Sequence, residues 1–123
     1  MFDPNFVLLY VDNPPQSAAF YAELLGHTPV ESHPTFAMFA LSSGVKLGLW
    51  SKHAVEPRAT APSGAAELAF TVESPDRVRA IHAAWSERGM PIAQAPTDLD
   101  FGHTFVALDP DGLRLRVFAP GAR

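Results

Sequence analysis

The feature that most constrains this chain is an internal repeat of one strand-to-helix junction. A strand-like run near the start ends at Asn13-Pro14, and an amphipathic stretch then continues to Gly26. A second such run ends at Ser74-Pro75, and its amphipathic stretch continues to Gly89. In both places a side chain that caps helices precedes a proline suited to the first helical turn, and a glycine suited to the helix end follows. The repeat predicts two modules of the same design.

Each predicted helix is followed by three further strand candidates, so each module is predicted to be β-α-β-β-β. The candidates are residues 28–31, 35–41, 45–50, 92–95, 103–108 and 113–118. Module one spans residues 5–50, a linker rich in Ala, Pro and Ser spans 51–64, and module two spans 65–119. Because a module of this size alone buries little surface, we expect residues 1–123 to form a single domain.

Composition excludes several classes of protein. The 123-residue chain has no cysteine, which rules out disulfide frameworks and thiolate zinc sites. Its formal net charge of −4, without a cluster of basic residues, disfavours a nucleic-acid partner. There is no apolar run near the ~20 residues that a membrane span requires, and the N-terminus does not resemble a signal peptide. We therefore expect a cytoplasmic protein with no membrane partner.

Alternation along the strands predicts two sheet faces of different character. The face toward the helices is apolar: Val7, Leu9, Val11, Val45, Leu47, Leu49, Leu68, Phe70, Val72, Leu113, Leu115 and Val117. The opposite face carries Phe6, Leu8, Tyr10, Lys46, Gly48, Trp50, Glu67, Ala69, Thr71, Arg114, Arg116 and Phe118. A face that mixes aromatic and small residues with a few polar groups is typical of a small-molecule pocket.

Trp50 is the strongest binding candidate, because Gly48 on the same face leaves space beside it. A flat aromatic ligand stacked on the indole would gain ~0.5–1.5 kcal/mol beyond simple burial. The alternative is an ordinary core or interface tryptophan. Trp85, by contrast, shares a helix stripe with Val78 and Ile81 and is predicted to be core.

The remaining candidates are less clear-cut. Phe36, Met38 and Phe39 lie on both parities of one strand, so some are predicted to line a cavity while core packing is the alternative for each. Phe101 lies in a loop from which it could close over a ligand, and His103 lies near a strand end from which it could donate to one. The full set of predicted ligand-binding residues is Phe6, Tyr10, Phe36, Met38, Phe39, Trp50, Glu67, Phe101, His103 and Arg116. No catalytic residue is assigned.

The paired modules, their Asp-Asn-Pro and Glu-Ser-Pro junctions and the turn at residues 109–112 resemble the vicinal oxygen chelate superfamily. This superfamily includes glyoxalases, extradiol dioxygenases and bleomycin-resistance proteins. The segments Leu49-Trp50-Ser51 and Phe101-Gly102-His103-Thr104-Phe105 are more specifically similar to its phenazine-antibiotic-binding resistance proteins. The resemblance implies an α+β fold whose tandem modules form a curved mixed sheet around a cleft. It also implies a homodimer whose clefts are built from both subunits.

Enzymes of this superfamily hold a divalent metal at positions that align here with Phe6, Gly48, Glu67 and Arg116. A phenyl ring and a glycine cannot ligate, and a guanidinium only donates, so one potential ligand remains where three or four are needed. We therefore expect neither metal nor cofactor. Glu67 and Arg116 are expected either to pair with each other or to bind polar groups of a ligand, and a solvated pair is the alternative.

The resulting hypothesis is a metal-free protein that sequesters a flat, hydrophobic aromatic antibiotic, phenazine-like or bleomycin-like, and so confers resistance without turnover. The first alternative is a metal-dependent lyase, isomerase or dioxygenase of the same superfamily. The second is an accessory domain whose cleft is filled by its own aromatic side chains.

Overall fold

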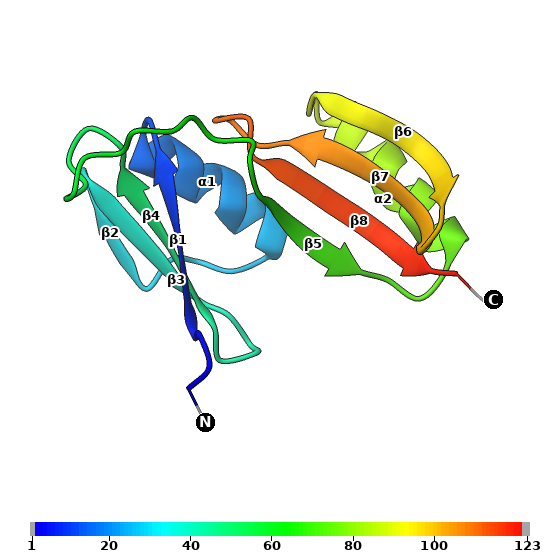
Figure 1. Ribbon diagram of the computed structural model, residues 1–123, viewed down its shortest axis with the longest axis horizontal. Helices are drawn as coiled ribbons and strands as arrows, with labels where there is room; N and C mark the ends of the chain where they lie inside the picture. The colour runs from blue at the N-terminus through cyan, green and yellow to red at the C-terminus, as the bar shows by residue number, and fades with distance from the viewer. Residues whose placement is uncertain (1, 122–123) are drawn as a thin grey trace. The chain divides into compact units, whose positions relative to one another are not determined.

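The computed structural model describes residues 2–121 and divides into two compact units, Met1–Ala61 and Pro62–Arg123, referred to below as module one and module two. Their boundary lies in the predicted linker. Each module runs β-α-β-β-β along the chain (Figure 1). In module one the elements are β1 (Phe6–Val11), α1 (Pro14–Leu25), β2 (Glu31–His33), β3 (Phe36–Ala40) and β4 (Lys46–Ser51). In module two they are β5 (Glu67–Thr71), α2 (Pro75–Glu87), β6 (Ile92–Leu99), β7 (Gly102–Leu108) and β8 (Arg114–Pro120).

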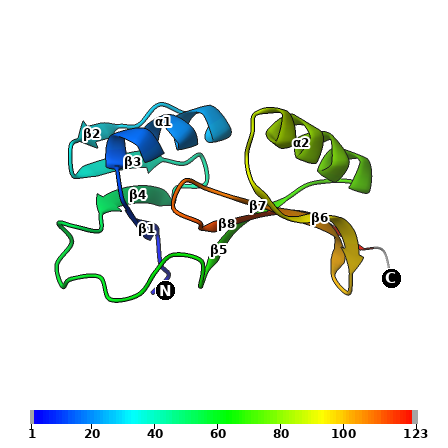
Figure 2. The ribbon, with the colours of Figure 1, turned by 90° about the horizontal axis from the view of Figure 1, so that it is seen from above.

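The α+β class and the two β-α-β-β-β modules are therefore confirmed. The strands form two mixed four-stranded sheets, ordered β1-β4-β3-β2 and β5-β8-β7-β6, where a single curved sheet was expected. In each sheet the first and last strands of the module pair in parallel and the other neighbours are antiparallel. One helix covers one side of each sheet, which leaves an open face on the other side (Figure 2).

The helix boundaries follow the predicted signals. The Asn13 side chain accepts a 3.0 Å hydrogen bond from the backbone N–H of Gln16, and Ser74 accepts one of 3.1 Å from Arg77. These bonds satisfy donors of the first helical turn that have no partner within the helix. Gly26 ends α1 with φ 69°, a left-handed conformation that costs glycine little.

The core of each module lies between its helix and its sheet. In module one, Tyr21 of α1 and the strand residues Val11, Phe39 and Leu49 are almost fully buried. In module two, Trp85 of α2 packs edge-to-face against Phe70 and Phe105. The predicted helix-facing alternation therefore holds for most positions. Val7, however, is 38% exposed, so α1 does not cover the start of β1.

Two strands differ from their predicted positions. The strand expected at residues 28–31 lies at Glu31–His33. Its position is set by pairing with β3 across a two-residue turn, which places Glu31 opposite Met38 and His33 opposite Phe36. The strand expected to end at Ala95 continues to Leu99, with two register shifts along it. Such irregularities depend on the partner strand and leave no local sequence signal. No helix among residues 2–121 is long and apolar enough to cross a membrane.

The start of the linker is tied back to module one. The backbone N–H of Lys52 donates to the carbonyl of Val11, and Val55 is buried. His53 Nε2 lies 2.8 Å from Asp12 Oδ1, at the end of β1. This hydrogen bond is the main cause that lowers the pKa of the Asp12 carboxyl below its ordinary value of 3.8, and the charge of Lys52 assists.

We predict that His53→Ala raises the pKa of Asp12 toward 3.8, as followed by carbon NMR of the carboxyl during an acid titration. A carboxyl whose pKa is lowered by folding contributes stability above its unfolded value, and that contribution disappears as the pH falls through its folded value. The difference in unfolding free energy between the variant and wild type should therefore be present above pH 3.8 and decline as the pH falls through the lowered pKa of Asp12. An Asp12 pKa that is the same in both proteins would contradict this assignment.

Candidate ligand-binding site

The open face of module one gathers aromatic and aliphatic side chains from three adjacent strands. Tyr10 of β1 and Phe36 of β3 lie on either side of Trp50 in the strand register. Leu8 and Met38 lie on either side of Gly48 in the same way. Because neighbouring positions across a sheet point to the same side, strand pairing brings these residues together on the open face.

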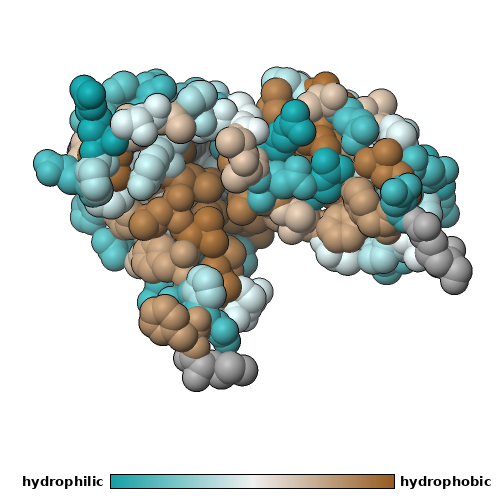
Figure 3. Space-filling model, in the orientation of Figure 1, coloured by the Kyte–Doolittle hydropathy of each residue, from teal (hydrophilic) through white to brown (hydrophobic). Residues whose placement is uncertain are grey.

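A shallow hollow of about 400 Å³ lies on this face and is lined by Phe6, Leu8, Phe36 and Trp50. Figure 3 shows hydrophobic side chains gathered over β1, β3 and β4 in this region. The rings of Phe36 and Trp50 meet edge-to-face, with centroids 6.4 Å apart and planes at 90°. Phe6 and Leu8 remain 40% and 44% exposed, which is unusual for large apolar side chains that lie side by side.

Gly48 lies beneath these side chains. A Cβ atom at this position would lie 2.6 Å from Leu8 Cδ2 and 3.0 Å from Phe6 Cε1. It would also lie 3.2 Å from Phe36 Cε1. The absence of a side chain therefore lets three surrounding side chains close over the backbone of β4, which sets the depth of the hollow.

The open face of module two carries an ion pair at the positions equivalent to Phe6 and Gly48. Arg116 Nε donates to Glu67 Oε1 at 2.6 Å, and Arg116 Nη1 donates to Thr104 Oγ1 at 3.2 Å. The Thr104 hydroxyl in turn donates to the carbonyl of Val117 at 2.9 Å. The side chain of Arg116 is 16% exposed and that of Glu67 is 34% exposed. The expected pairing of these two residues is observed, and it is partly shielded from water.

Phe101 covers this ion pair from the turn between β6 and β7. Its ring centroid lies 5.6 Å from Arg116 Cζ, within the range of a cation–π contact. Its ring also meets that of Phe118 edge-to-face at 5.6 Å. With 45% of its surface exposed, Phe101 lies on top of the cluster and forms part of the surface that a ligand would meet.

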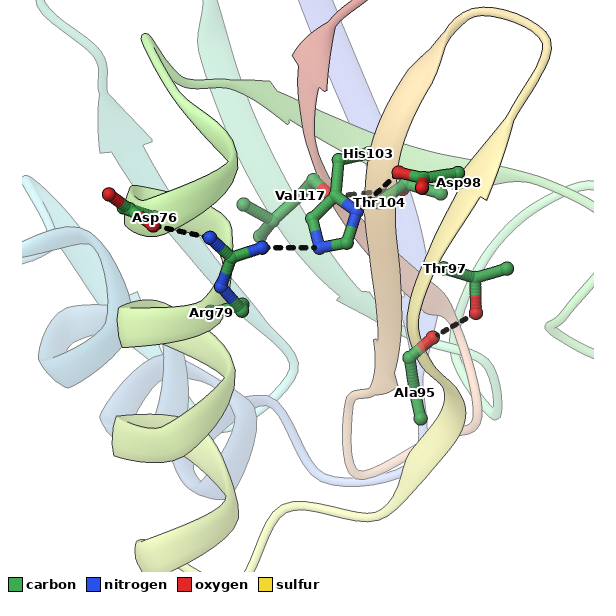
Figure 4. A network of polar contacts seen from close by, with 8 residues as sticks. All are labelled: Asp76, Arg79, Ala95, Thr97, Asp98, His103, Thr104 and Val117. Atoms are coloured by element: carbon green, nitrogen blue, oxygen red, sulfur yellow. Dashed lines mark hydrogen bonds and ion pairs between the residues drawn. The ribbon is translucent and has the colours of Figure 1, made fainter.

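Two predicted site residues lie on the helix side of their sheets and not on the open faces. Phe39 is fully buried on the helix side of module one, because it pairs with Leu47 and thus shares the face that α1 covers. His103 lies on the helix side of module two, where Arg79 of α2 reaches its Nε2 (Figure 4). The parity of β7 explains this: His103 is two residues before Phe105, which packs against Trp85 of α2. Neither residue joins the open faces.

The structure also identifies residues that the sequence did not single out. Leu8 lines the hollow, although only its face was predicted. Thr104 and Phe118 complete the surroundings of Arg116. Strand alternation placed Phe118 on the open face, whereas the role of Thr104 depends on the register of β7 against β8, for which no sequence signal exists.

The residues at the superfamily's metal positions do not fit a metal ion. Phe6 and Gly48 offer no ligand atom, and the Glu67 carboxylate is already bonded to a guanidinium. Within residues 2–121, no group of three or more His, Asp or Glu side chains is arranged to hold an ion. Chemistry that requires a metal held by these positions is therefore not supported by the side chains present.

We predict that Glu67 and Arg116 are energetically coupled. Hydrogen bonds between charged, partly buried groups contribute about 1.5–3 kcal/mol, so Glu67→Gln and Arg116→Met should each destabilise the protein, and the double variant by less than their sum. Urea unfolding of the four proteins measures the coupling. Glu73 and Arg77, whose side chains are 71% and 57% exposed, are the matched control, and their coupling should not exceed about 0.5 kcal/mol. Equal coupling in both pairs would contradict the expectation that partial burial from water strengthens the Glu67–Arg116 interaction.

Comparisons with known proteins agree with this architecture. The phenazine antibiotic resistance protein EhpR of Enterobacter agglomerans is 30% identical over 118 residues, which cover 93% of this chain and 89% of EhpR. The solution NMR structure of a protein from Agrobacterium tumefaciens is 50% identical, with a TM-score of 0.87, covering 99% of this chain and all of that one.

A glyoxalase/bleomycin resistance protein/dioxygenase from Nocardioides has the same fold, with a TM-score of 0.80 at 23% identity, covering 98% of this chain and 84% of that one. The family model named Glyoxalase/Bleomycin resistance protein/Dioxygenase superfamily matches residues 4–117. Since that match covers nearly the whole chain, the protein belongs to the glyoxalase/bleomycin resistance protein/dioxygenase superfamily.

Proposed function

We propose that this chain binds a flat, hydrophobic aromatic small molecule without a metal ion and sequesters it. The observation that carries the proposal is the apolar hollow of about 400 Å³ beside Trp50. Its size falls within the range of small-molecule sites, and it is lined by aromatic and aliphatic side chains that water would otherwise cover. Similarity to a phenazine antibiotic resistance protein supports an antibiotic of the phenazine type as the ligand and resistance as the outcome.

Within the hollow, the Trp50 indole provides the stacking surface, and the space above Gly48, where the sequence predicts room for a ligand, is filled by Leu8, Phe6 and Phe36. The ring of Phe36 stands perpendicular to Trp50 and holds it from one side. A planar ligand placed against the indole would cover Phe6 and Leu8, which are exposed in the free protein. Burying that apolar surface contributes roughly 25 cal/mol for each Å² removed from water. Binding of this kind needs no bond-making step, so capture of one ligand by one site is sufficient for resistance.

On the open face of module two, Glu67 and Arg116 are proposed to supply polar contacts to a ligand. Each already satisfies the charge of the other, so the pair presents a fixed dipole and no net charge. Such a pair accepts and donates hydrogen bonds without requiring an oppositely charged partner. This property suits a neutral heteroaromatic molecule with ring nitrogens or carbonyl groups better than a strongly cationic drug.

The direct test is a titration of chelator-treated protein with phenazine, followed by tryptophan fluorescence and by equilibrium dialysis. We predict saturable binding with a dissociation constant on the order of micromolar or tighter. Trp50→Phe should weaken binding about threefold to tenfold, since it removes part of the stacking surface. Trp85→Phe is the control, because Trp85 packs between α2 and the sheet of module two and should leave affinity unchanged.

Two results would contradict the proposal. The first is no saturable binding of phenazine by dialysis, which does not depend on a fluorescent signal. The second is equal weakening by Trp50→Phe and Trp85→Phe, which would show that the hollow is not where the ligand lies. Binding that appears only after addition of a divalent metal would favour the alternative function, that of a metal-dependent enzyme of the same superfamily.

We also propose that the chain acts as a homodimer. One support is the resemblance to the vicinal oxygen chelate superfamily, which implies a homodimer. The other is the exposure of β1: Val7, on the side facing α1, is 38% exposed, and Tyr10, on the open face, is 42% exposed. An apolar strand exposed on both sides favours association with another chain. Sedimentation equilibrium should give twice the chain mass of 13.3 kDa. The mass of one chain at every concentration up to about 100 μM would contradict a dimer of ordinary micromolar affinity.

A further inference from the structure

The polar cluster on the helix side of module two lies directly behind the turn that carries Phe101. His103 Nδ1 lies 2.7 Å from Asp98 Oδ1. Since Asp98 and His103 are opposite each other on β6 and β7, this contact joins the two strands next to the turn. On its other side, His103 Nε2 lies 3.4 Å from Arg79 Nη1 of α2. Arg79 is also paired with Asp76, one turn earlier on the same helix (Figure 4).

The hydrogen-bond pattern fixes the imidazole in one orientation. A guanidinium only donates, so the nitrogen that faces Arg79 must be the acceptor. The proton of the neutral ring is then on Nδ1 and is donated to Asp98. The His103 side chain is only 13% exposed although Asp98 is 90% exposed, so the ring is enclosed between strand and helix while its partners reach it from the surface.

The same short segment determines where Phe101 lies. Phe101 is the second residue of a two-residue turn between Leu99 and Gly102, and its carbonyl accepts a 2.9 Å hydrogen bond from the backbone of Gly121. At Gly102, with φ 150°, a Cβ atom would lie 2.0 Å from the carbonyl oxygen of Ala119. The turn is therefore pressed closely against the end of β8, and the ring of Phe101 projects over Arg116 and Phe118.

We propose that His103 is a positioning residue: through Asp98 and Arg79 it holds the β6–β7 turn so that Phe101 stays over Arg116. The inference rests on the proposed function, in which Arg116 contributes to ligand binding. It assigns a role to a polar cluster that lies outside both open faces. Without the imidazole, the end of edge strand β6 loses this polar connection to α2, and Phe101 becomes free to leave the guanidinium.

The test begins in the free protein with an NMR signal that responds to the position of the Phe101 ring. The Nε–H of Arg116 is bonded to Glu67 and lies near the Phe101 ring, so its chemical shift includes a ring-current contribution. Phe101→Ala should remove that contribution. His103→Ala should move the signal toward the Phe101→Ala position, and the double variant should move it no further. His103→Asn, whose amide can still donate to Asp98, should move it back toward wild type.

Two further variants keep the test valid if His103→Ala fails to fold. Arg79→Ala alters a side chain that is 53% exposed and should move the signal part of the way. Arg77→Ala, on the same helix and paired with Glu73, is the control and should leave it unchanged. The proposal is overturned if His103→Ala and Arg79→Ala leave the signal at its wild-type position, or if the shifts of His103→Ala and Phe101→Ala add.

This NMR test does not depend on phenazine binding. If wild type does not bind phenazine at all, the proposed function fails, while the NMR signal of the free protein still decides whether His103 positions Phe101.

Discussion

The parallel pairing of the first and last strands determines where the other elements of each module lie. It places β1 beside β4 and β5 beside β8, with the same relative register in both modules: Phe6 pairs with Lys46, and Glu67 pairs with Arg114. Positions two residues further along the last strand, Gly48 and Arg116, then lie next to the first strand on the open face. A parallel pair of this kind requires a long connection, which the helix and hairpin supply.

The two modules use the same pair of positions for different chemistry. In module one, a phenyl ring lies over a glycine, and the surroundings are apolar. In module two, a carboxylate and a guanidinium pair with each other, supported by Thr104 and covered by Phe101. One module thus offers a stacking surface and the other a fixed polar contact. Of these four residues only the Glu67 carboxylate could ligate a metal ion, and it is bonded to Arg116.

The features that the sequence predicts well are those with local causes. Asn13, Ser74 and Gly26 act within one helical turn, so their capping roles follow from residue type alone. Alternation along β4 and β8 fixes which side chains share a face, and it placed Trp50, Gly48 and Arg116 correctly on the open faces. The sequence allows Glu67 and Arg116 to pair, to bind a ligand or to form a solvated pair; the structure shows them paired. Two opposite charges on adjacent strands attract each other more strongly when water is partly excluded.

The features that the sequence predicts poorly depend on partners distant in the chain. The position of β2 and the side on which Phe39 lies are set by pairing with neighbouring strands, and a strand with aromatic residues on both parities gives no indication of its facing. His103 was interpreted from its place near a strand end. Its partners Asp98 and Arg79 come from another strand and from the helix, so the sequence alone does not bring them together.

The proposed ligand is a planar aromatic molecule that lies against Trp50 on the open face of module one. Intermolecular NOEs between phenazine and isotope-labelled, chelator-treated protein test it most directly, because each NOE identifies protons that lie within a few ångströms of each other. We predict NOEs from phenazine to the Trp50 indole, the Phe36 ring and the Leu8 methyl groups. NOEs confined to residues outside the hollow, or an absence of NOEs at saturating phenazine, would contradict it.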